Sequence, residues 1–347
     1  MNRHEGISNG GRSGRLKRIL GSRPFRAAVS AGLLAALFLK LGFSGDLAQT
    51  GQTLIQVQGD LLALGIFVFL VTNMVSVSKW LLIVRAQGQT VMGRPVSYLY
   101  LTSLFYIGLF FNNLMLTSVG GDVVRAFKLS RASSRPPEAA GSVFLDRVSS
   151  TVALLVLAMI AMLWGLKDLP VQYAFMILGM FIVSLAMVAF FASERAARRL
   201  GRFPLLRMDP LGLRRHLRSF YFSLNEFKRL PRTLAVVLAV SFTYQILHIL
   251  TVYVLALALG ITIPVMYYFL FIPVVLAVSM LPISIGGFGV RESAWVVLFS
   301  QVGVGAGQAL SMSLLSVMVM TAVSLAGGVF YLFDRAVPAP EGETGNG

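Results

Sequence analysis

The chain has 347 residues, of which 56% are hydrophobic and 13% charged, and its mean hydropathy is +0.77. A soluble domain has no means of burying so much apolar surface. The apolar runs are also continuous rather than alternating, so we predict an all-α integral membrane protein. The chain has a formal net charge of +16, three scattered histidines and no cysteine. These features exclude disulfides and thiolate chemistry and argue against a metal cluster.

Residues 1–24 are rich in Gly, Ser and Arg, and we expect them to form a disordered basic tail on the cytoplasmic side. Residues 25–43 form an apolar run with a basic flank, which is similar to a signal peptide but lacks a small-x-small cleavage site. We therefore predict an uncleaved first helix. Basic segments beside apolar spans indicate anionic lipid headgroups at the cytoplasmic face as partners, and no nucleic acid.

Further apolar runs predict a multi-span helical bundle, with one transmembrane domain over residues 25–333 and a disordered tail at 334–347. The runs cover residues 59–84, 97–119, 142–166, 170–193, 232–259, 264–282, 293–304 and 307–333. We place this multi-pass chain in the cell membrane, with both termini cytoplasmic. Between the fourth and fifth runs, residues 211–230 have the periodicity of an amphipathic helix on the inner surface. This helix is either an anchoring connector or a device that gathers lipid.

The run 97–119 conflicts with a simple count of spans. Arg85 and Arg94 place its start inside, so a full crossing would put the next loop outside, although that loop is rich in basic residues. A re-entrant segment that returns to the inner face removes the conflict. Asn112 and Asn113 then lie where the helix breaks at depth, which is tolerated where protein or a watery cavity covers the backbone.

Two similar octets carry the main functional signal. SVGGDVVR spans residues 118–125 and SIGGFGVR spans 284–291, and the two share Ser, Gly, Gly, Val and Arg at matched positions. The second octet lies between the short runs 264–282 and 293–304, which form either a re-entrant pair or two short spans. The constant offset and opposite insertion of the octets predict an inverted repeat with a substrate site at the repeat interface.

The chemistry of the octets fits an anionic headgroup. Glycine pairs let backbone N–H groups approach a phosphate, serine adds a hydroxyl donor, and arginine adds a planar fork that binds phosphate through two hydrogen bonds. We predict that Arg125 and Arg291 contact a lipid phosphate. Asp122 and Glu292 would hold these guanidinium groups when no ligand is bound. The alternative is that the glycines only permit close helix packing.

The glycine alternatives differ in what they predict for an added methyl group. In a headgroup site, Gly121 and Gly287 leave space for the ligand, so alanine there would spare the melting temperature and remove stabilisation by lipid. A third charged pair, Asp146 and Arg147, lies near the start of a span and is either functional or a simple interfacial pair. The full predicted substrate site is Asn112, Asn113, Ser118, Gly120, Gly121, Asp122, Arg125, Asp146, Arg147, Pro282, Ser284, Gly286, Gly287, Gly289, Arg291 and Glu292.

Three stretches resemble the membrane domain of lysylphosphatidylglycerol synthases. They are NNLMLTSVGGDVVRAFKL, GSVFLDRVSS and LPISIGGFGVRESAWVVLFSQVGV, and the resemblance extends from about residue 25 to residue 333. Two positions depart from the family pattern. Leu116 stands where a proline is usual, and the pair Asp146-Arg147 stands where Glu-Arg is frequent. The resemblance implies helical spans with re-entrant halves and movement of a phospholipid or isoprenoid-type lipid across a bilayer.

Three function classes follow, and the leading one is a lipid flippase or transporter for an anionic phospholipid or isoprenoid-type lipid. The alternatives are an intramembrane transferase that uses a lipid-phosphate donor and a non-transporting assembly partner of an envelope-lipid enzyme. The transferase is disfavoured because the chain has no Asp-x-Asp motif and few acidic residues. We expect no cofactor, and the lack of a nucleotide-binding loop argues against direct use of ATP. The candidate protein partners are further copies of this chain in a homo-oligomer, or an envelope-lipid biosynthetic enzyme.

Overall fold

The computed structural model describes residues 46–91, 93–114, 120–165, 178–179, 182, 230–280 and 289–333. In chain order the elements are α3 (Asp46–Ile55), α4 (Gly59–Ala86), β1 (Thr90–Val91), β2 (Arg94–Pro95), α5 (Tyr98–Leu114), α6 (Gly120–Ala132), α7 (Pro136–Gly165), α12 (Pro231–Ala258), α13 (Val265–Met280), α14 (Val290–Ser300) and α15 (Ala306–Phe333). The predicted tails, the first helix at 25–43, the connector around 211–229 and most of the run 170–193 lie outside these residues.

Four of the described helices, α4, α7, α12 and α15, are long and apolar enough to cross a membrane by length and composition. This confirms the prediction of an all-α membrane protein. The helices of the two shorter pairs, α5 with α6 and α13 with α14, have 17, 13, 16 and 11 residues. Each is shorter than the roughly 20 residues that a spanning helix needs.

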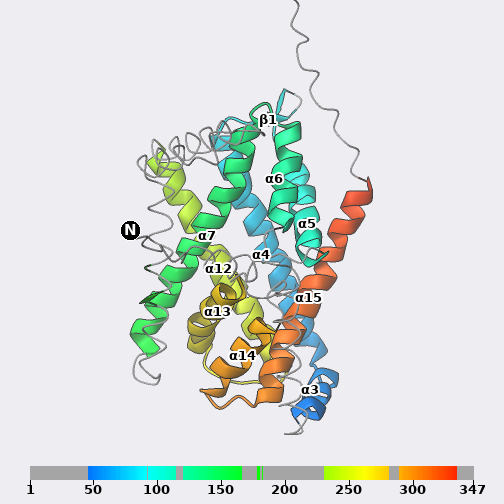
Figure 1. Ribbon diagram of the computed structural model, residues 1–347, viewed down its shortest axis with the longest axis vertical. Helices are drawn as coiled ribbons and strands as arrows, with labels where there is room; N and C mark the ends of the chain where they lie inside the picture. Colours follow the sequence, from blue (N-terminus) through cyan, green and yellow to red (C-terminus); the bar gives the residue numbers. More distant parts are fainter. Residues whose placement is uncertain are drawn as a thin grey trace, which may run out of the picture.

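The centre of the bundle is the antiparallel pair of α4 and α12. At one end, the backbone N–H of Gln58 donates a hydrogen bond to the carbonyl oxygen of Ala258 over 2.9 Å. Gly65 of α4 allows close contact, because a Cβ there would meet the side chain of Leu255 at 2.7 Å. Figure 1 shows α5 and α6 in the half of the bundle next to the β-hairpin, and α13 and α14 in the opposite half.

Helices α5 and α6 form a helical hairpin, and the start of α5 and the end of α6 both lie beside the pair of β1 and β2. The antiparallel pair of β1 and β2 leads into α5, and the end of α6 returns to β1, where the N–H of Ser134 donates to the carbonyl of Thr90 over 3.0 Å. Val91 also bridges to Ser133. The chain therefore turns back within 97–134, but the returning arm is α6 and not part of the run 97–119 that was predicted to return. Helix α5 ends at Leu114, directly after the asparagine pair that the sequence marked as a break.

Helices α13 and α14 form the second short pair. Helix α14 begins at Val290, directly after Gly289, whose φ of 81° is outside the helical range, and the Gly289 N–H donates to Glu292 Oε2 over 2.7 Å. The two octets therefore differ locally. Gly120 already starts α6, whereas α14 starts four octet positions later. Val123 stands where the second octet has Gly289, and a β-branched residue avoids positive φ, so the first octet continues as helix.

Apolar packing divides along the same lines. One buried cluster joins α4, α5, α6 and α7 around Trp80, Leu104 and Leu129. A larger one joins α4, α7 and α12 to α13, α14 and α15 around Tyr268, Phe271 and Phe299. Each short helix pair thus has its own core against the long helices.

The described helix ends and loops at the two ends of the bundle differ in charge. The end with the β-hairpin carries five arginines: Arg85, Arg94, Arg131, Arg135 and Arg232. The opposite end, at residues 56–58, 259–264 and 301–305, carries neither lysine nor arginine. By the positive-inside rule, this asymmetry favours the β-hairpin end as the cytoplasmic one.

Candidate functional site

Five charged side chains from three helices meet inside the β-hairpin half of the bundle, and we call them the charge cluster. Its members are Lys79 of α4, Asp122 and Arg125 of α6, and Asp146 and Arg147 of α7. At 1.5 Å per helical residue, Lys79 and Asp146 lie about 10–15 Å from the basic ends of their helices. The cluster is therefore at a depth where apolar side chains dominate.

Asp146 is the centre of the charge cluster. Its Oδ1 lies 2.9 Å from Lys79 Nζ, and its Oδ2 accepts a hydrogen bond of 2.8 Å from Arg125 Nη2. Lys79 Nζ also donates to the backbone oxygen of Asp146 over 3.0 Å and to the Ser150 hydroxyl. One carboxylate thus neutralises parts of two cations from different helices, and it ties α4 and α6 to α7.

Arg125 is enclosed on several sides. Its Nε lies 3.0 Å from Asp122 Oδ1, and its guanidinium carbon lies 4.9 Å from the centroid of the Trp80 ring. The Trp80 indole N–H donates to the Ser142 hydroxyl over 3.0 Å, which fixes the ring against α7. An arginine between two carboxylates and an aromatic face has little freedom to reach a separate ligand.

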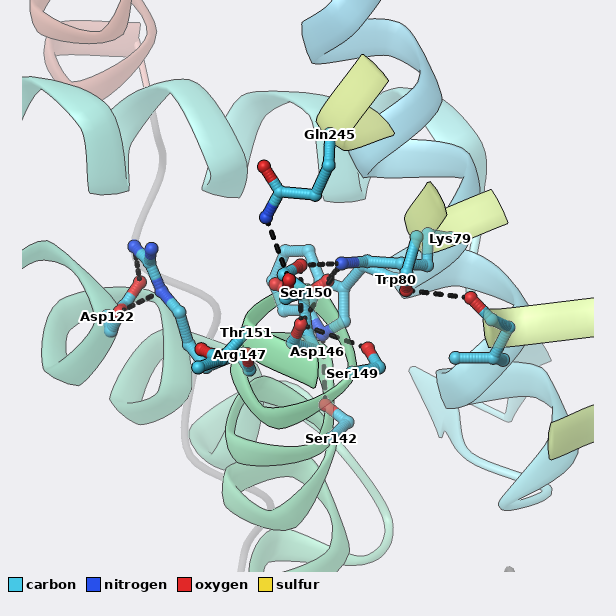
Figure 2. A network of polar contacts seen from close by, with 12 residues as sticks. Lys79, Trp80, Asp122, Ser142, Asp146, Arg147, Ser149, Ser150, Thr151 and Gln245 are labelled. Atoms are coloured by element: carbon cyan, nitrogen blue, oxygen red, sulfur yellow. Dashed lines mark hydrogen bonds and ion pairs between the residues drawn. The ribbon is translucent and has the colours of Figure 1, made fainter. Parts of the chain in front are cut away.

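Arg147 is the open member of the charge cluster. Its Nε and Nη2 lie 2.5 Å and 3.0 Å from the two oxygens of Asp122. The side chains of Lys79, Arg125, Asp146 and Asp122 are 0%, 3%, 5% and 12% exposed, whereas that of Arg147 is 42% exposed. Figure 2 shows Arg147 extending away from Asp146 toward Asp122.

The charge cluster does not balance. Three cations face two carboxylates, so the cluster carries one excess positive charge when all five groups are ionised. An uncompensated charge is costly at membrane depth, and the cluster gains stability from an anion. The Asp122 bonds use two of the five guanidinium N–H donors of Arg147, and the exposed side of Arg147 carries the others, which we call its open edge.

Gln245 of α12 lies beside the charge cluster. Its Nε2 donates to the backbone oxygen of Ser150 over 2.8 Å, while its Oε1 is buried with no hydrogen-bond partner among the described residues. Figure 2 places Gln245 next to Ser150, close to Lys79. Lys79 Nζ lies 5.2 Å from the ring centroid of Tyr244, one residue before Gln245.

The sequence analysis missed Lys79, Trp80 and Gln245 as site residues. The signal for Lys79 was a lone charge within an apolar run.

The asparagines and glycines of the first octet region connect helices. Asn112 Oδ1 accepts the backbone N–H of Gly121 over 2.8 Å, which caps the start of α6, and Asn113 Nδ2 donates to Ser324 of α15 over 2.6 Å. A Cβ on Gly121 would lie 1.8 Å from the carbonyl oxygen of Gly108. The neighbouring backbone, not open space, lies beside Gly121, so the structure favours the packing alternative there. Gly120 is buried at the first position of α6.

The second octet is described in part. Arg291 donates from Nη2 to Glu292 Oε1 over 2.5 Å, and Glu292 also caps α14 through Gly289. These residues belong to α14, in the other half of the bundle from the charge cluster (Figure 1). The remaining predicted site residues lie outside the described residues: Ser118, Pro282, Ser284, Gly286 and Gly287. Within the described part of the chain, no group of three or more His, Asp or Glu side chains is placed to hold a metal ion.

Comparison with known proteins agrees with this architecture. Residues 25–328 match the family model described as the lysylphosphatidylglycerol synthase TM region. The UPF0104 membrane protein PH1989 of Pyrococcus horikoshii is 27% identical over 266 residues, which cover 69% of this chain and 78% of that protein. No solved structure matches the chain significantly. Because the family model covers most of the sequence, including the charge cluster and α14, the chain belongs to the lysylphosphatidylglycerol synthase transmembrane-region family.

Proposed function

We propose that this protein binds an anionic lipid by its phosphate at the open edge of Arg147 and moves that lipid across the membrane. Membership of the family and the four apolar helices support a membrane protein with a lipid-related role. The observation that carries the finer proposal is the excess positive charge of the charge cluster, exposed mainly at Arg147. A phosphodiester headgroup with one negative charge would balance it.

The remaining members of the charge cluster prepare Arg147 for this task. Asp122 holds the guanidinium by two contacts, which fixes its plane and leaves the outer donors free. Arg125 also forms an ion pair with Asp122, so this carboxylate keeps a cationic partner when the headgroup binds Arg147. Asp146 in turn keeps Arg125 and Lys79 in place. The cluster thus presents one preformed anion site, which reduces the entropy cost of binding.

The test of binding is an Arg147→Gln variant purified beside the wild-type protein. Glutamine keeps a polar side chain with hydrogen-bond donors, although a shorter one, and removes the charge. Native mass spectrometry should show that co-purified anionic lipid falls about tenfold or more, the effect of losing a charged hydrogen bond. Arg131→Gln, at the basic end of α6 outside the cluster, is the matched control and should retain lipid.

Movement is tested in vesicles that contain a fluorescent short-chain phosphatidylglycerol. Wild-type protein should speed the exposure of inner-leaflet probe to a quencher added outside, and Arg147→Gln should not. If Arg147→Gln retains lipid and moves the probe at the wild-type rate, the open edge of Arg147 is not the headgroup site. Lipid retention without movement in the wild type would contradict transport.

We further propose that the α5–α6 hairpin is re-entrant from the cytoplasmic side. Ser97 and Ser134 are exposed at its two outer ends, and Ser300 is exposed at the other end of the bundle. Cysteines at these positions in a chain without native cysteine should react with an impermeant thiol reagent as follows: 97 and 134 from the cytoplasmic side, 300 from the opposite side. Labelling of 97 and 134 from opposite sides would show that the segment crosses the membrane.

A further inference from the structure

A line of buried and partly buried polar side chains continues from the charge cluster into the middle of the bundle, between α4 and α12, and we call it the polar seam. On α4 it comprises the buried Thr72, Ser76 and Lys79, and on α12 it comprises the buried Ser241 and Gln245 and the partly buried Tyr244 and His248. Thr72, Ser76 and Lys79 repeat at helical spacing on the side of α4 where Gly65 meets Leu255 of α12.

Some polar atoms of the seam have no hydrogen-bond partner among the described residues. They are Gln245 Oε1 and His248 Nδ1. The hydroxyls of Thr72 and Ser241 bond within their own helices. Buried polar atoms without partners are rare in folded proteins, so they point to something that the seam binds. The seam therefore offers both donors and acceptors at mid-bundle depth.

Tyr244 and His248 are the titratable members of the polar seam that lie beyond the charge cluster, and His248 is the one that can gain a proton. It occupies the middle of α12, and its ring stacks on Tyr244 with centroids 6.2 Å apart and planes 15° apart. The centroid of the Tyr244 ring is in turn 5.2 Å from Lys79 Nζ. Two ring contacts thus join His248 to the cluster that carries the excess positive charge.

The charged and titratable side chains on α12 and on the helices packed against it set the electrostatic environment of His248. On α12 and the described helices that contact it they are Asp60, Lys79, Arg85, Glu138, Asp146, Arg147, Arg232, Tyr244, Tyr253, Tyr267, Tyr268 and Tyr331. Of these, the carboxylate in the cluster beside the seam, Asp146, is already bonded to Lys79 and Arg125. A proton on His248 of the empty protein would therefore add to an existing positive charge.

An anion at Arg147 changes this balance. One negative charge neutralises the excess positive charge of the cluster. A proton on His248 then gives a net charge of one, the same as that of the empty protein, whereas without the anion it would raise that charge to two. Binding of the anion therefore favours binding of the proton, and by thermodynamic linkage the proton favours the anion by the same factor. Carrying both together also removes the cost of moving a net negative charge through the membrane interior.

We propose that His248 takes up one proton together with the anionic lipid, so that lipid and proton cross as a neutral pair. The inference rests on the proposed function of Arg147 and adds to it a proton site and an energy source, the proton gradient. The proton comes from water on the loading side and adds to the free lone pair of the imidazole. It returns to water on the other side when the lipid leaves and the repulsion from the charge cluster is restored.

The test uses vesicles loaded with a pH-sensitive dye and the fluorescent phosphatidylglycerol probe. In the wild type, lipid movement should acidify the receiving side, and an imposed pH gradient in the same direction should speed lipid movement about fivefold or more, the lower end of typical coupling. In detergent, acidification from about pH 8 to about pH 5 should tighten binding of the probe about tenfold.

Two variants remove the proton site in different ways. His248→Gln keeps polarity, and His248→Phe keeps a ring against Tyr244. Both should lose the gradient effect, the dye signal and the pH dependence of probe binding, with His216→Gln as the control that removes a different histidine. Retention of all three effects in both variants would overturn the proposal.

The outcomes separate this inference from the proposed function. Lipid movement in the wild type without a dye signal and without a gradient effect contradicts the proton site and leaves lipid transport standing. Absence of both probe binding and lipid movement in the wild type contradicts the proposed function and the proton site with it. Melting curves of the two variants show that any loss is not caused by unfolding.

Discussion

Asp146→Asn is expected to destabilise the protein by about 3–5 kcal/mol, because it removes the shared partner of two buried cations and leaves both without their charge balance. Lys79 and Arg125 are 0% and 3% exposed, so water does not replace the lost carboxylate. The change keeps the shape of the side chain, and the effect is therefore electrostatic. In detergent, the melting temperature should fall by roughly 5–10 °C.

Two further variants show whether the cause is the charge cluster. Asp60→Asn, at the exposed start of α4, should melt like the wild type. Adding Lys79→Met to Asp146→Asn removes one of the two stranded cations, so the double variant should be more stable than the sum of the single effects by about 1–3 kcal/mol. Additive effects, or a wild-type melting curve for Asp146→Asn, would mean that the cluster does not stabilise the bundle.

Gly121→Ala is expected to lower stability by about 1–3 kcal/mol whether or not lipid is present, because overpacking forces two helix backbones apart. The added Cβ would lie 1.8 Å from the carbonyl oxygen of Gly108 and 2.8 Å from the side chain of Asn112. A neighbouring backbone has little room to move. The same displacement weakens the bond from the Gly121 N–H to Asn112, so the hairpin loses its cap as well as its close packing.

Glycines with different surroundings make a graded control. Gly51 in α3 has nothing within 4 Å of an added Cβ, so Gly51→Ala should be neutral or slightly stabilising. At Gly108 the nearest atom would lie 3.1 Å away, and the effect of Gly108→Ala should be intermediate. If Gly121→Ala melts normally but loses stabilisation by added anionic lipid, the headgroup alternative holds at this position.

This expectation for Gly121 reverses the one that follows from the octet pattern. Paired glycines serve a ligand site and a helix contact equally well, because both need the space of a missing Cβ. The octet itself carries no information about which atoms occupy that space. The carbonyl of Gly108 favours helix packing here, and Gly108 lies outside the octet.

The predicted helices agree well with the structure where the apolar run is long. The runs 59–84, 232–259 and 307–333 correspond to α4, α12 and α15, whose ends differ by only a few residues. Helix α7 begins at residue 136 rather than 142, because Pro136 and Glu138 suit the first turn of a helix although neither is apolar. Hydropathy alone misses such a polar first turn.

Charge placement along the chain predicted that residues 97–119 turn back to the inner face, since basic loops and spans must alternate consistently. The chain does turn back, and the asparagine pair lies where α5 ends, but the returning arm is α6, which the sequence analysis treated as a basic loop. The predicted equivalence of the two octets does not extend to the contacts of their arginines. Arg125 is enclosed by carboxylates from two helices, whereas Arg291 pairs with its sequence neighbour Glu292.

By itself, the sequence determined the class, the long helices and the residues that carry charge into the membrane, because hydropathy, helical period and loop charge are local properties of the chain. Only the tertiary structure decided how these charges pair. Lys79 and Asp146 are 67 positions apart, and Gln245 lies 95 positions from Ser150. Their contact depends on which faces α4, α7 and α12 turn toward one another, and that is set by packing of the whole bundle. The same packing buries Arg125 and leaves Arg147 open, so the candidate site is a product of the fold rather than of either octet.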